Sequence, residues 1–484
     1  MLQTFVRVSA MACLLVVAYE MNGAIANQTA IKFLVDKGEY AKAEALLQAQ
    51  VDDVAAPITG DAAVQLETIR RMRREFPLSK AEVLNQVRET IPDATAEDIE
   101  RWTESGDLHH RVIDGDLRYF RRGASNLPRL NDDAKRRRDA ALEARGEKPK
   151  PRFDLPSVIR EVYAERERTG ADEVYPVHHH VTYTVTVKDS CDRVVPGATV
   201  RAWLPFPQEY RHQSQVRLVS SSPEVKHTAP NGSPHRTVYF EETIGADAKP
   251  PELAVEFDFV TAAYCPDLDP AAVKPYGQGG ETYRQYTAER LPHIALTSEV
   301  RQLAASIVGD ESNPLRKAQR LFTWVSKNIT WIGEMEYGAV PSLSLKGLTM
   351  RCGDCGVQNI SFVTLCRAVG VPARWQSGFG TKPGEENMHD WAEFYVEPWG
   401  WLPVDASYGL QKSDDPKVRD FFCGHMDPYR LIVNLDYARP LDPPATSLRA
   451  EPNDFQRGEI EIDGHNLYFD DWRWDLKVET KRVE

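Results

Sequence analysis

The sequence predicts a multidomain α+β protein. A chain of 484 residues is long enough to bury several separate hydrophobic cores. Helical periodicity is concentrated in the N-terminal part and again after residue 355, whereas short alternating patterns fill residues 173–268. Helix-rich and strand-rich stretches that follow one another along the chain are typical of this fold class.

The first 26 residues have the pattern of a secretory signal. Arg7 precedes an apolar run, Val8–Tyr19, and Ala24–Ala26 provides an A-x-A cleavage site before Asn27. The run is short for a membrane span, so an uncleaved anchor is the minor alternative, and no other segment has membrane length. We therefore expect a periplasmic or secreted protein without an integral membrane segment after cleavage.

Residues 27–125 predict a helical region that ends in a β-hairpin. The turn Ile113–Asp116 contains an Asp-Gly pair and joins predicted strands at Leu108–Val112 and Leu117–Phe120. Helices followed by such a wing resemble a winged-helix fold, for which DNA binding would be the functional interpretation. Export and a net charge of −13 oppose nucleic acid as a partner, so we expect a packing or docking module.

Residues 126–172 predict a charged helical linker, and residues 173–268 predict a β-sandwich. The basic run Lys135–Arg138 is typical of a solvated helix or linker. Cys191 and Cys265 flank the strand-rich segment, and an oxidising compartment would allow a disulfide between them. The predicted strands are separated by Pro, Gly and Asn turns and comprise His180–Val187, Thr199–Leu204, Val216–Ser220, Arg236–Phe240 and Leu253–Val260.

Cys355 stands at the start of a predicted helix in the last domain, residues 269–484. Gly370 ends the helical pattern, and Pro372 follows it. Backbone N–H groups and the helix dipole at an N-terminus lower a thiol pKa and can stabilise an oxyanion. The sequence therefore predicts an activated cysteine nucleophile.

His389 and Asp405 are associated with two neighbouring strands. His389 lies at the entry to a predicted strand, Trp391–Val396, and Asp405 directly follows the next one, Trp401–Val404. Antiparallel pairing of these strands would bring the imidazole and the carboxylate together, facing the helix that carries the thiol. A carboxylate in that position fixes the tautomer and orientation of a catalytic histidine.

The segments around these three residues resemble those of the transglutaminase-like superfamily of cysteine enzymes. The resemblance extends over roughly residues 284–410, and three motifs in the right order make it specific. It rests on Pro314–Trp331, Gly353–Arg374, His389–Glu393 and Gly400–Asp405.

The resemblance implies a papain-like catalytic domain, in which a helix packs on an antiparallel sheet. It implies that Cys355 is the nucleophile, that His389 is the general base and acid, and that Asp405 orients the histidine. It also implies that an aromatic residue completes the oxyanion site, for which Trp331 and Tyr337 are the candidates.

Cys352 forms a C-x-x-C motif with Cys355. Such a pair signals redox chemistry or half of a zinc site in other proteins, but a second pair with matching spacing is missing from this sequence. We therefore expect neither a metal nor an organic cofactor. Cys352 is a candidate redox partner, because a reversible disulfide with Cys355 would inactivate the nucleophile.

Together these patterns predict an exported cysteine peptidase, amidase or acyltransferase that acts on a protein or peptide through a Cys thioester. The resemblance favours hydrolysis over transfer, because bacterial proteins of this shape are often peptidases or amidases. The alternative is a non-catalytic peptide- or glycan-binding protein built on the same fold. In either case, residues 411–484 form a C-terminal β extension of the catalytic domain, with Trp472 and Trp474 in its core or along a substrate groove.

Overall fold

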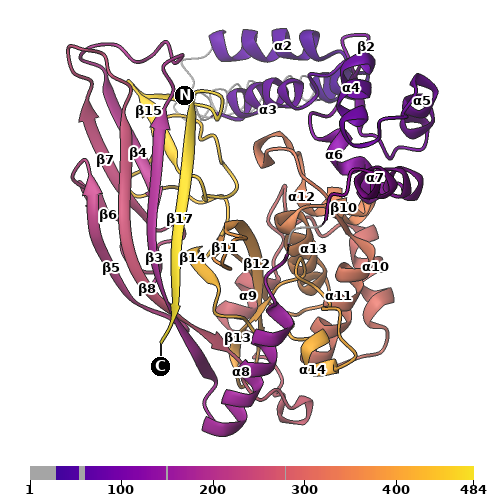
Figure 1. Cartoon of the computed structure of the whole chain (residues 1–484), viewed down its shortest axis with the longest axis vertical. Helices are drawn as coiled ribbons and strands as arrows, with labels where there is room; N and C mark the ends of the chain where they lie inside the picture. The colour runs from indigo at the N-terminus through magenta and orange to yellow at the C-terminus, as the bar shows by residue number, and fades with distance from the viewer. Residues whose placement is uncertain (1–28, 54–59, 149–150, 278, 484) are drawn as a thin grey trace, which may run out of the picture. The chain divides into compact units, whose positions relative to one another are not determined.

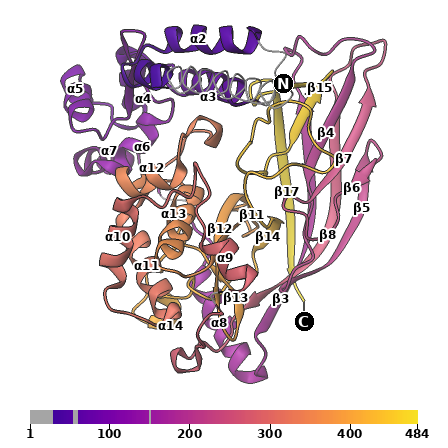
Figure 2. The ribbon, with the colours of Figure 1, turned by 180° about the vertical axis from the view of Figure 1, so that it is seen from behind.

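The structure is a computed structural model that describes residues 29–53, 60–148, 151–277 and 279–483 (Figures 1 and 2). The chain divides into two compact units, Met1–Glu147 and Lys148–Glu484. The predicted signal at residues 1–26 lies outside the described residues. None of the described helices combines the length and apolar composition needed to cross a membrane.

The first unit consists of helices around one core and a short hairpin. Ser79 and Thr95 each begin a helix with a capping box. Trp102, Tyr119 and Leu127 are among the buried residues that the helices and the hairpin share. Its elements are α2 (Tyr40–Asp53), α3 (Asp61–Glu75), α4 (Lys80–Thr90), α5 (Ala96–Glu104), β1 (His110–Ile113), β2 (Asp116–Tyr119), α6 (Gly123–Leu130) and α7 (Asp132–Ala144).

The hairpin β1–β2 forms at the predicted Asp-Gly turn. Asp114 and Gly115 have φ angles of 51° and 91°, so both adopt the left-handed conformation that a tight two-residue hairpin turn requires. The predicted linker at residues 126–172 is instead divided between the two units. α7 belongs to the first unit, where Arg137 of the basic run makes a 2.9 Å ion pair with Asp98. α8 (Leu155–Thr169) belongs to the second unit.

Two antiparallel sheets of the second unit share one hydrophobic core. One has the strand order β17-β3-β8-β5 and the other β16-β15-β4-β7-β6. Val181, Phe240 and Phe257 lie fully buried in their common core. The strands are β3 (Glu173–Val187), β4 (Thr199–Pro205), β5 (Gln213–Ser222), β6 (His227–Thr228), β7 (Thr237–Thr243), β8 (Glu252–Tyr264), β15 (Glu459–Ile462), β16 (His465–Asn466) and β17 (Trp472–Arg482).

The C-terminal strands complete these two sheets and not the catalytic sheet. β17 pairs with β3 from Trp472 opposite Val187 to Arg482 opposite Val177, and β15 pairs with β4. The predicted domain boundary at residue 268 therefore assigns β15 and β17 to a different domain from their partners β4 and β3. The predicted strand Leu467–Phe469 is a turn region between β16 and β17. Local patterns miss such pairing because partners more than 250 residues apart in sequence form it.

The disulfide that an oxidising compartment would allow between Cys191 and Cys265 is not formed. Cys191 follows the end of β3, where Thr186 pairs with Glu252, and Cys265 follows the end of β8, where Tyr264 pairs with Glu173. The two cysteines therefore lie at opposite ends of long antiparallel strands, roughly 40 Å apart at about 3.3 Å per residue. A disulfide requires Cα atoms within about 7 Å. Both cysteines are free thiols.

The third large sheet of this unit is antiparallel with the order β13-β12-β11-β14, and helix α13 packs on β11 and β12. Figures 1 and 2 show this sheet between the long strands β3, β8 and β17 on one side and helices α10 to α13 on the other. The elements are α9 (Glu281–Thr287), α10 (Ser298–Val308), α11 (Pro314–Asn328), β9 (Thr330–Trp331), α12 (Leu343–Met350), β10 (Cys352–Gly353), α13 (Cys355–Ala368), β11 (Ala373–Gly380), β12 (Asn387–Val396), β13 (Gly400–Val404), α14 (Pro416–Arg419) and β14 (Arg430–Asn434).

Candidate active site

Helix α13 begins at Cys355, as the sequence predicts. The side chain of Asp354 caps the helix by accepting a 3.2 Å hydrogen bond from the backbone N–H of Val357. Gly356 in the first turn lies so close to its neighbours that an added Cβ would be 2.0 Å from the Tyr337 hydroxyl. The nucleophile candidate is therefore held at the end of a tightly packed helix.

His389 and Asp405 meet through the antiparallel pairing of β12 and β13. His389 Nε2 lies 2.6 Å from Asp405 Oδ2, and both side chains are buried. The ring of Tyr408 stacks on the imidazole with centroids 4.5 Å apart. Since Nε2 is bound to Asp405, Nδ1 is the ring nitrogen available to a thiol or a substrate.

Arg430 on β14 is a cation that contacts the Asp405 carboxylate of this pair. Its Nη1 lies 2.8 Å from Asp405 Oδ2 and its Nη2 lies 2.8 Å from Asp427 Oδ2, with Arg430 and Asp405 fully buried. Burial opposes ionisation of Asp405, but the charges of His389 and Arg430 outweigh it and hold the pKa of this carboxyl well below its usual value. Burial lowers the pKa of His389, and Asp405 offsets part of that shift. A neutral imidazole beside an anionic carboxylate suits a general base.

Asn359 joins the helix to both strands. Its Nδ2 donates to the backbone oxygens of Cys355 and Asp390, each at 2.9 Å, and its Oδ1 accepts from the N–H of Ala406 at 3.0 Å. One buried amide therefore fixes the start of α13 relative to the strands that carry the histidine and the aspartate.

The Cys355 thiol has a partner that sequence patterns do not indicate. Its Sγ lies 3.2 Å from Asp390 Oδ2, to which it donates a hydrogen bond, and no hydrogen bond joins this thiol to His389, both residues being in the described part of the chain. Burial raises the pKa of Cys355 well above its ordinary value, and the nearby Asp390 and Asp354 raise it further. The prediction of a lowered thiol pKa is therefore wrong for this arrangement, because burial and two carboxyls outweigh the helix N-terminus.

The two oxyanion candidates occupy different environments. The Tyr337 hydroxyl is buried 2.8 Å from Asp354 Oδ1 and 3.0 Å from Asp390 Oδ2, so it adjoins the carboxyl that binds the thiol. Trp331 pairs with Gly353 through the backbone of β9 and β10, but its side chain is 40% exposed. The structure thus brings Tyr337, and not the Trp331 side chain, into the network around Cys355.

Cys352 is buried in β10, and no disulfide joins it to Cys355. Burial raises the pKa of Cys352, which disfavours the thiolate that disulfide formation needs. Among residues 29–53, 60–148, 151–277 and 279–483, no group of His, Cys, Asp and Glu side chains is arranged to hold a metal ion.

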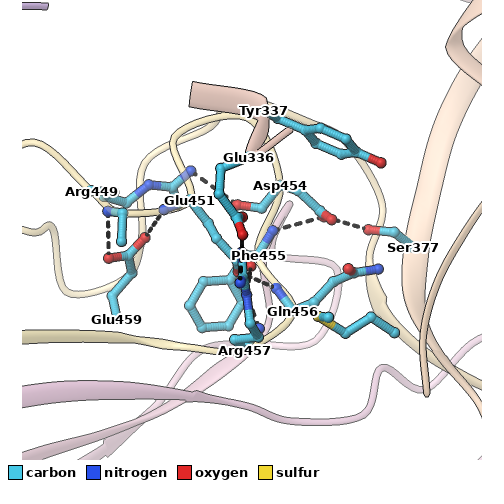
Figure 3. A network of polar contacts seen from close by, with 12 residues as sticks. Glu336, Tyr337, Ser377, Arg449, Glu451, Asp454, Phe455, Gln456, Arg457 and Glu459 are labelled. Atoms are coloured by element: carbon cyan, nitrogen blue, oxygen red, sulfur yellow. Dashed lines mark hydrogen bonds and ion pairs between the residues drawn. The ribbon is translucent and has the colours of Figure 1, made fainter. Parts of the chain in front are cut away.

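A connection between β14 and β15, the 449–457 segment, reaches the candidate site from outside the catalytic sheet. Arg457 pairs with Glu451 and Glu336, each at 2.5 Å, and the N–H groups of Ala450 and Glu451 donate to Glu459 on β15. Figure 3 shows this network beside Tyr337 and Ser377. The Arg457–Glu451 pair within the segment and the contacts with Glu336 and Glu459 give the segment a fixed conformation next to β11 and β12.

Gln456 is the member of the 449–457 segment that contacts the catalytic strand. Its Nε2 lies 2.9 Å from the backbone oxygen of His389, 2.9 Å from Asp390 Oδ1 and 3.0 Å from the backbone oxygen of Gly378. The sequence does not identify Gln456, Asn359 or Arg430 as site residues, because none of them belongs to a local motif. Asn359 lies in the predicted helix that begins at Cys355, but nothing in the helical pattern distinguishes it from its neighbours.

Residues 301–406, which include Cys355, His389 and Asp405, match the Transglutaminase-like superfamily. The chain contains a transglutaminase-like domain. An uncharacterised Haemophilus influenzae protein is 27% identical over 326 residues, which are 57% of this chain and 85% of that protein. The uncharacterised Bacillus subtilis protein YebA is 26% identical over 138 residues, which are 24% of this chain and 18% of YebA.

Solved structures share only distant similarity with the chain. A candidate cysteine protease from Cytophaga hutchinsonii aligns with a TM-score of 0.43 and 15% identity, over 64% of this chain and 91% of that one. The periplasmic domain of TgpA from Pseudomonas aeruginosa aligns with a TM-score of 0.25 and 13% identity, over 54% of this chain and 95% of that domain. The transglutaminase-like assignment therefore rests on the match of residues 301–406.

Proposed function

We propose that the protein is an exported cysteine enzyme that forms an acyl-thioester with protein or peptide amides and passes the acyl group mainly to water. The observation that carries this proposal is the 2.6 Å contact of His389 with the buried Asp405, on the strand against which the helix of Cys355 packs. Asp405 stays anionic, so His389 has a fixed tautomer with Nδ1 free for proton transfer.

The proposed reaction passes one proton through His389 Nδ1 in each of its two halves. The Cys355 thiol gives its proton to His389 Nδ1, and the sulfur forms a bond to the carbonyl carbon of the amide. The tetrahedral intermediate then breaks its C–N bond, and Nδ1–H protonates the departing amine. Water next loses a proton to Nδ1 and attacks the thioester, which releases the acid and restores the thiol.

Activity against pools of peptides, glutamine donors and glycopeptides tests this function. We expect release of ammonia or amine by the parent protein, and loss of at least about 10³-fold in Cys355→Ala and His389→Gln. Cys191→Ser, which changes a buried thiol of the sandwich, is the matched control and is expected to retain activity. Full activity of Cys355→Ala would refute the proposal, and a parent protein without activity against any of the pools would favour the binding protein.

Export is supported by the N-terminal pattern of residues 1–26. Expression of the full chain in a bacterium with two membranes, followed by N-terminal sequencing, tests it. We expect a periplasmic protein that starts at Asn27. A cytosolic protein that retains Met1 would contradict export and leave the proposed chemistry untouched.

A further inference from the structure

Asp390 is a buried carboxyl that has no cationic partner. It is 2% exposed, and no Lys, Arg or His in the described residues forms an ion pair with it, whereas Asp405 is paired with both His389 and Arg430. A buried carboxyl without a cation costs stability, and an asparagine of the same shape would avoid that cost. The side chain of Asp390 also shares a hydrogen bond with the carboxyl of Asp454, so its acidic partners, and not cations, surround it.

The contacts of Asp390 converge on the proposed nucleophile. Oδ2 accepts a hydrogen bond from the Cys355 thiol at 3.2 Å and lies 3.0 Å from the Tyr337 hydroxyl. Oδ1 accepts from Gln456 Nε2 at 2.9 Å, and the same amide reaches the backbone oxygen of His389. The carboxyl thus has a fixed orientation, with one oxygen aimed at the sulfur.

We propose that Asp390 is a positioning residue that holds Cys355 as a thiol, hydrogen-bonded to the Asp390 carboxyl and not to His389, in the resting site. This inference rests on the proposed acyl transfer through Cys355. Activation requires the thiol to leave Oδ2 and turn to His389 Nδ1. The proton then passes from sulfur to Nδ1, and the thiolate attacks the carbonyl carbon.

Burial and the neighbouring carboxyls oppose the ionisation of Asp390. Burial raises the pKa of Asp390 well above its usual value, and Asp454 and Asp354 add to the shift. Burial likewise raises the pKa of Asp354 to about 7 and that of Asp454 to about 6. The titratable and charged groups that act on the thiol, on this carboxyl or on its neighbours Asp354 and Asp454 are Glu334, Tyr337, Lys346, Asp354, Glu451 and Asp454.

The cations near this cluster are engaged with other carboxylates. Lys346 pairs with Glu334, and Arg457 pairs with Glu336 and Glu451. Asp454 accepts hydrogen bonds from Ser377 Oγ at 2.8 Å and from the N–H of Phe455 at 2.7 Å, as Figure 3 shows. No positive charge in contact with the sulfur is therefore present among these groups to favour its thiolate in the resting arrangement.

The rate of iodoacetamide modification of Cys355 between pH 5 and 10 tests the role of Asp390, with peptide mass spectrometry to identify the site. At the pH at which the thiol titrates, an ionised Asp390 opposes the thiolate, so removal of the carboxyl in Asp390→Asn and Asp390→Ala is expected to lower the midpoint of this profile by about one pH unit. Below both midpoints the thiolate fraction, and with it the rate, then rises about tenfold. Asp454→Asn, which does not touch the sulfur, is expected to cause a smaller shift in the same direction.

A merely structural role of Asp390 gives different results. It predicts a lower melting temperature of Asp390→Asn and an unchanged midpoint, whereas we expect an unchanged or higher melting temperature. An unchanged or raised midpoint in both folded variants would overturn the proposal. Because alkylation needs no substrate, this outcome would leave acyl transfer by Cys355 standing. Conversely, an active Cys355→Ala protein would refute acyl transfer but would not change the alkylation profiles of the parent and of the Asp390 variants.

Discussion

Asp405 is the residue on which the electrostatics of the site depend. Its carboxylate contacts His389 at 2.6 Å and Arg430 at 2.8 Å in a fully buried position. The arginine keeps the carboxylate ionised, and the carboxylate raises the pKa of a histidine that burial alone would lower further. The chain Asp427–Arg430–Asp405–His389 thus sets the protonation state of the proposed base.

Asp405→Asn is expected to reduce kcat/KM on the order of 10³-fold, because the imidazole loses both its orientation and its countercharge. The acid limb of the parent pH–rate profile should lie below pH 6.5, since the pKa of His389 is lowered. In the variant that limb should move to still lower pH, because a neutral amide no longer favours the imidazolium. A limb that stays in place would show that Asp405 does not influence the base.

Arg430→Leu is expected to lower the free energy of unfolding by about 3–5 kcal/mol, because it leaves the carboxyls of Asp405 and Asp427 buried without a cation. Urea denaturation followed by circular dichroism measures this change. Arg439→Leu is the matched control. The Arg439 side chain, which pairs with Asp436, is 40% exposed, so loss of this pair should lower the free energy of unfolding by at most about 1 kcal/mol. Equal losses in both variants would argue against a special role for the buried cation.

At the scale of elements, β11 lies between β14 and β12, the strand that carries His389. The close contact of β11 with β14 therefore sets the position of β12. Gly378 permits that contact: an added Cβ would lie 1.9 Å from the backbone oxygen of Leu431. A backbone atom cannot move aside as a flexible side chain can. The spacing of β11 and β14 therefore depends on a residue without a side chain.

Gly378→Ala is expected to force β14 away from β11 and to cost about 1–3 kcal/mol or more, with a matching loss of activity. Gly279→Ala is the control, because an added Cβ there meets no atom within 4 Å. Thermal unfolding of both variants makes the comparison. A Gly378→Ala protein as stable as the parent would show that the two strands can separate without cost.

The elements of the site differ in how far the sequence predicts them. α13, β12 and β13 form where helical and alternating patterns predict them, because their apolar residues keep that spacing although nearly every residue of α13 and β12 is buried. β11 escapes prediction since it is buried on both faces and contains Gly378 and Gly380, so no alternation remains. The thiol–Asp390 contact and Gln456 depend on tertiary approach between distant segments, which no local pattern encodes.

At the scale of the whole molecule, the second unit joins two sheets of the sandwich type to the transglutaminase-like domain through one core. Phe379 of β11 and Leu431 and Val433 of β14 belong to the same buried cluster as Val181 and Phe257 of the long strands. The chain reaches the last strands of those sheets only after it has passed through the catalytic sheet. The transglutaminase-like domain therefore depends on the sheets for part of its packing.

A fragment of residues 148–484 is expected to unfold cooperatively and to retain the reactivity of Cys355, because it contains the whole second unit. A fragment of residues 269–484 is expected to be unstable or insoluble, since it exposes β15 and β17 without their partners β4 and β3. Circular dichroism melting and size-exclusion chromatography compare the two. A cooperative, soluble shorter fragment would contradict the shared core.

Mass spectrometry of a trapped acyl-enzyme tests the proposed chemistry most directly. The parent protein is mixed with an activated acyl donor, quenched in acid within the first turnover and digested. We predict one acyl group on the peptide that contains Cys355, its loss in Cys355→Ala and its strongly slowed formation in His389→Gln. Acylation at another residue, or turnover by a Cys355→Ala protein that forms no adduct, would contradict a thioester at Cys355.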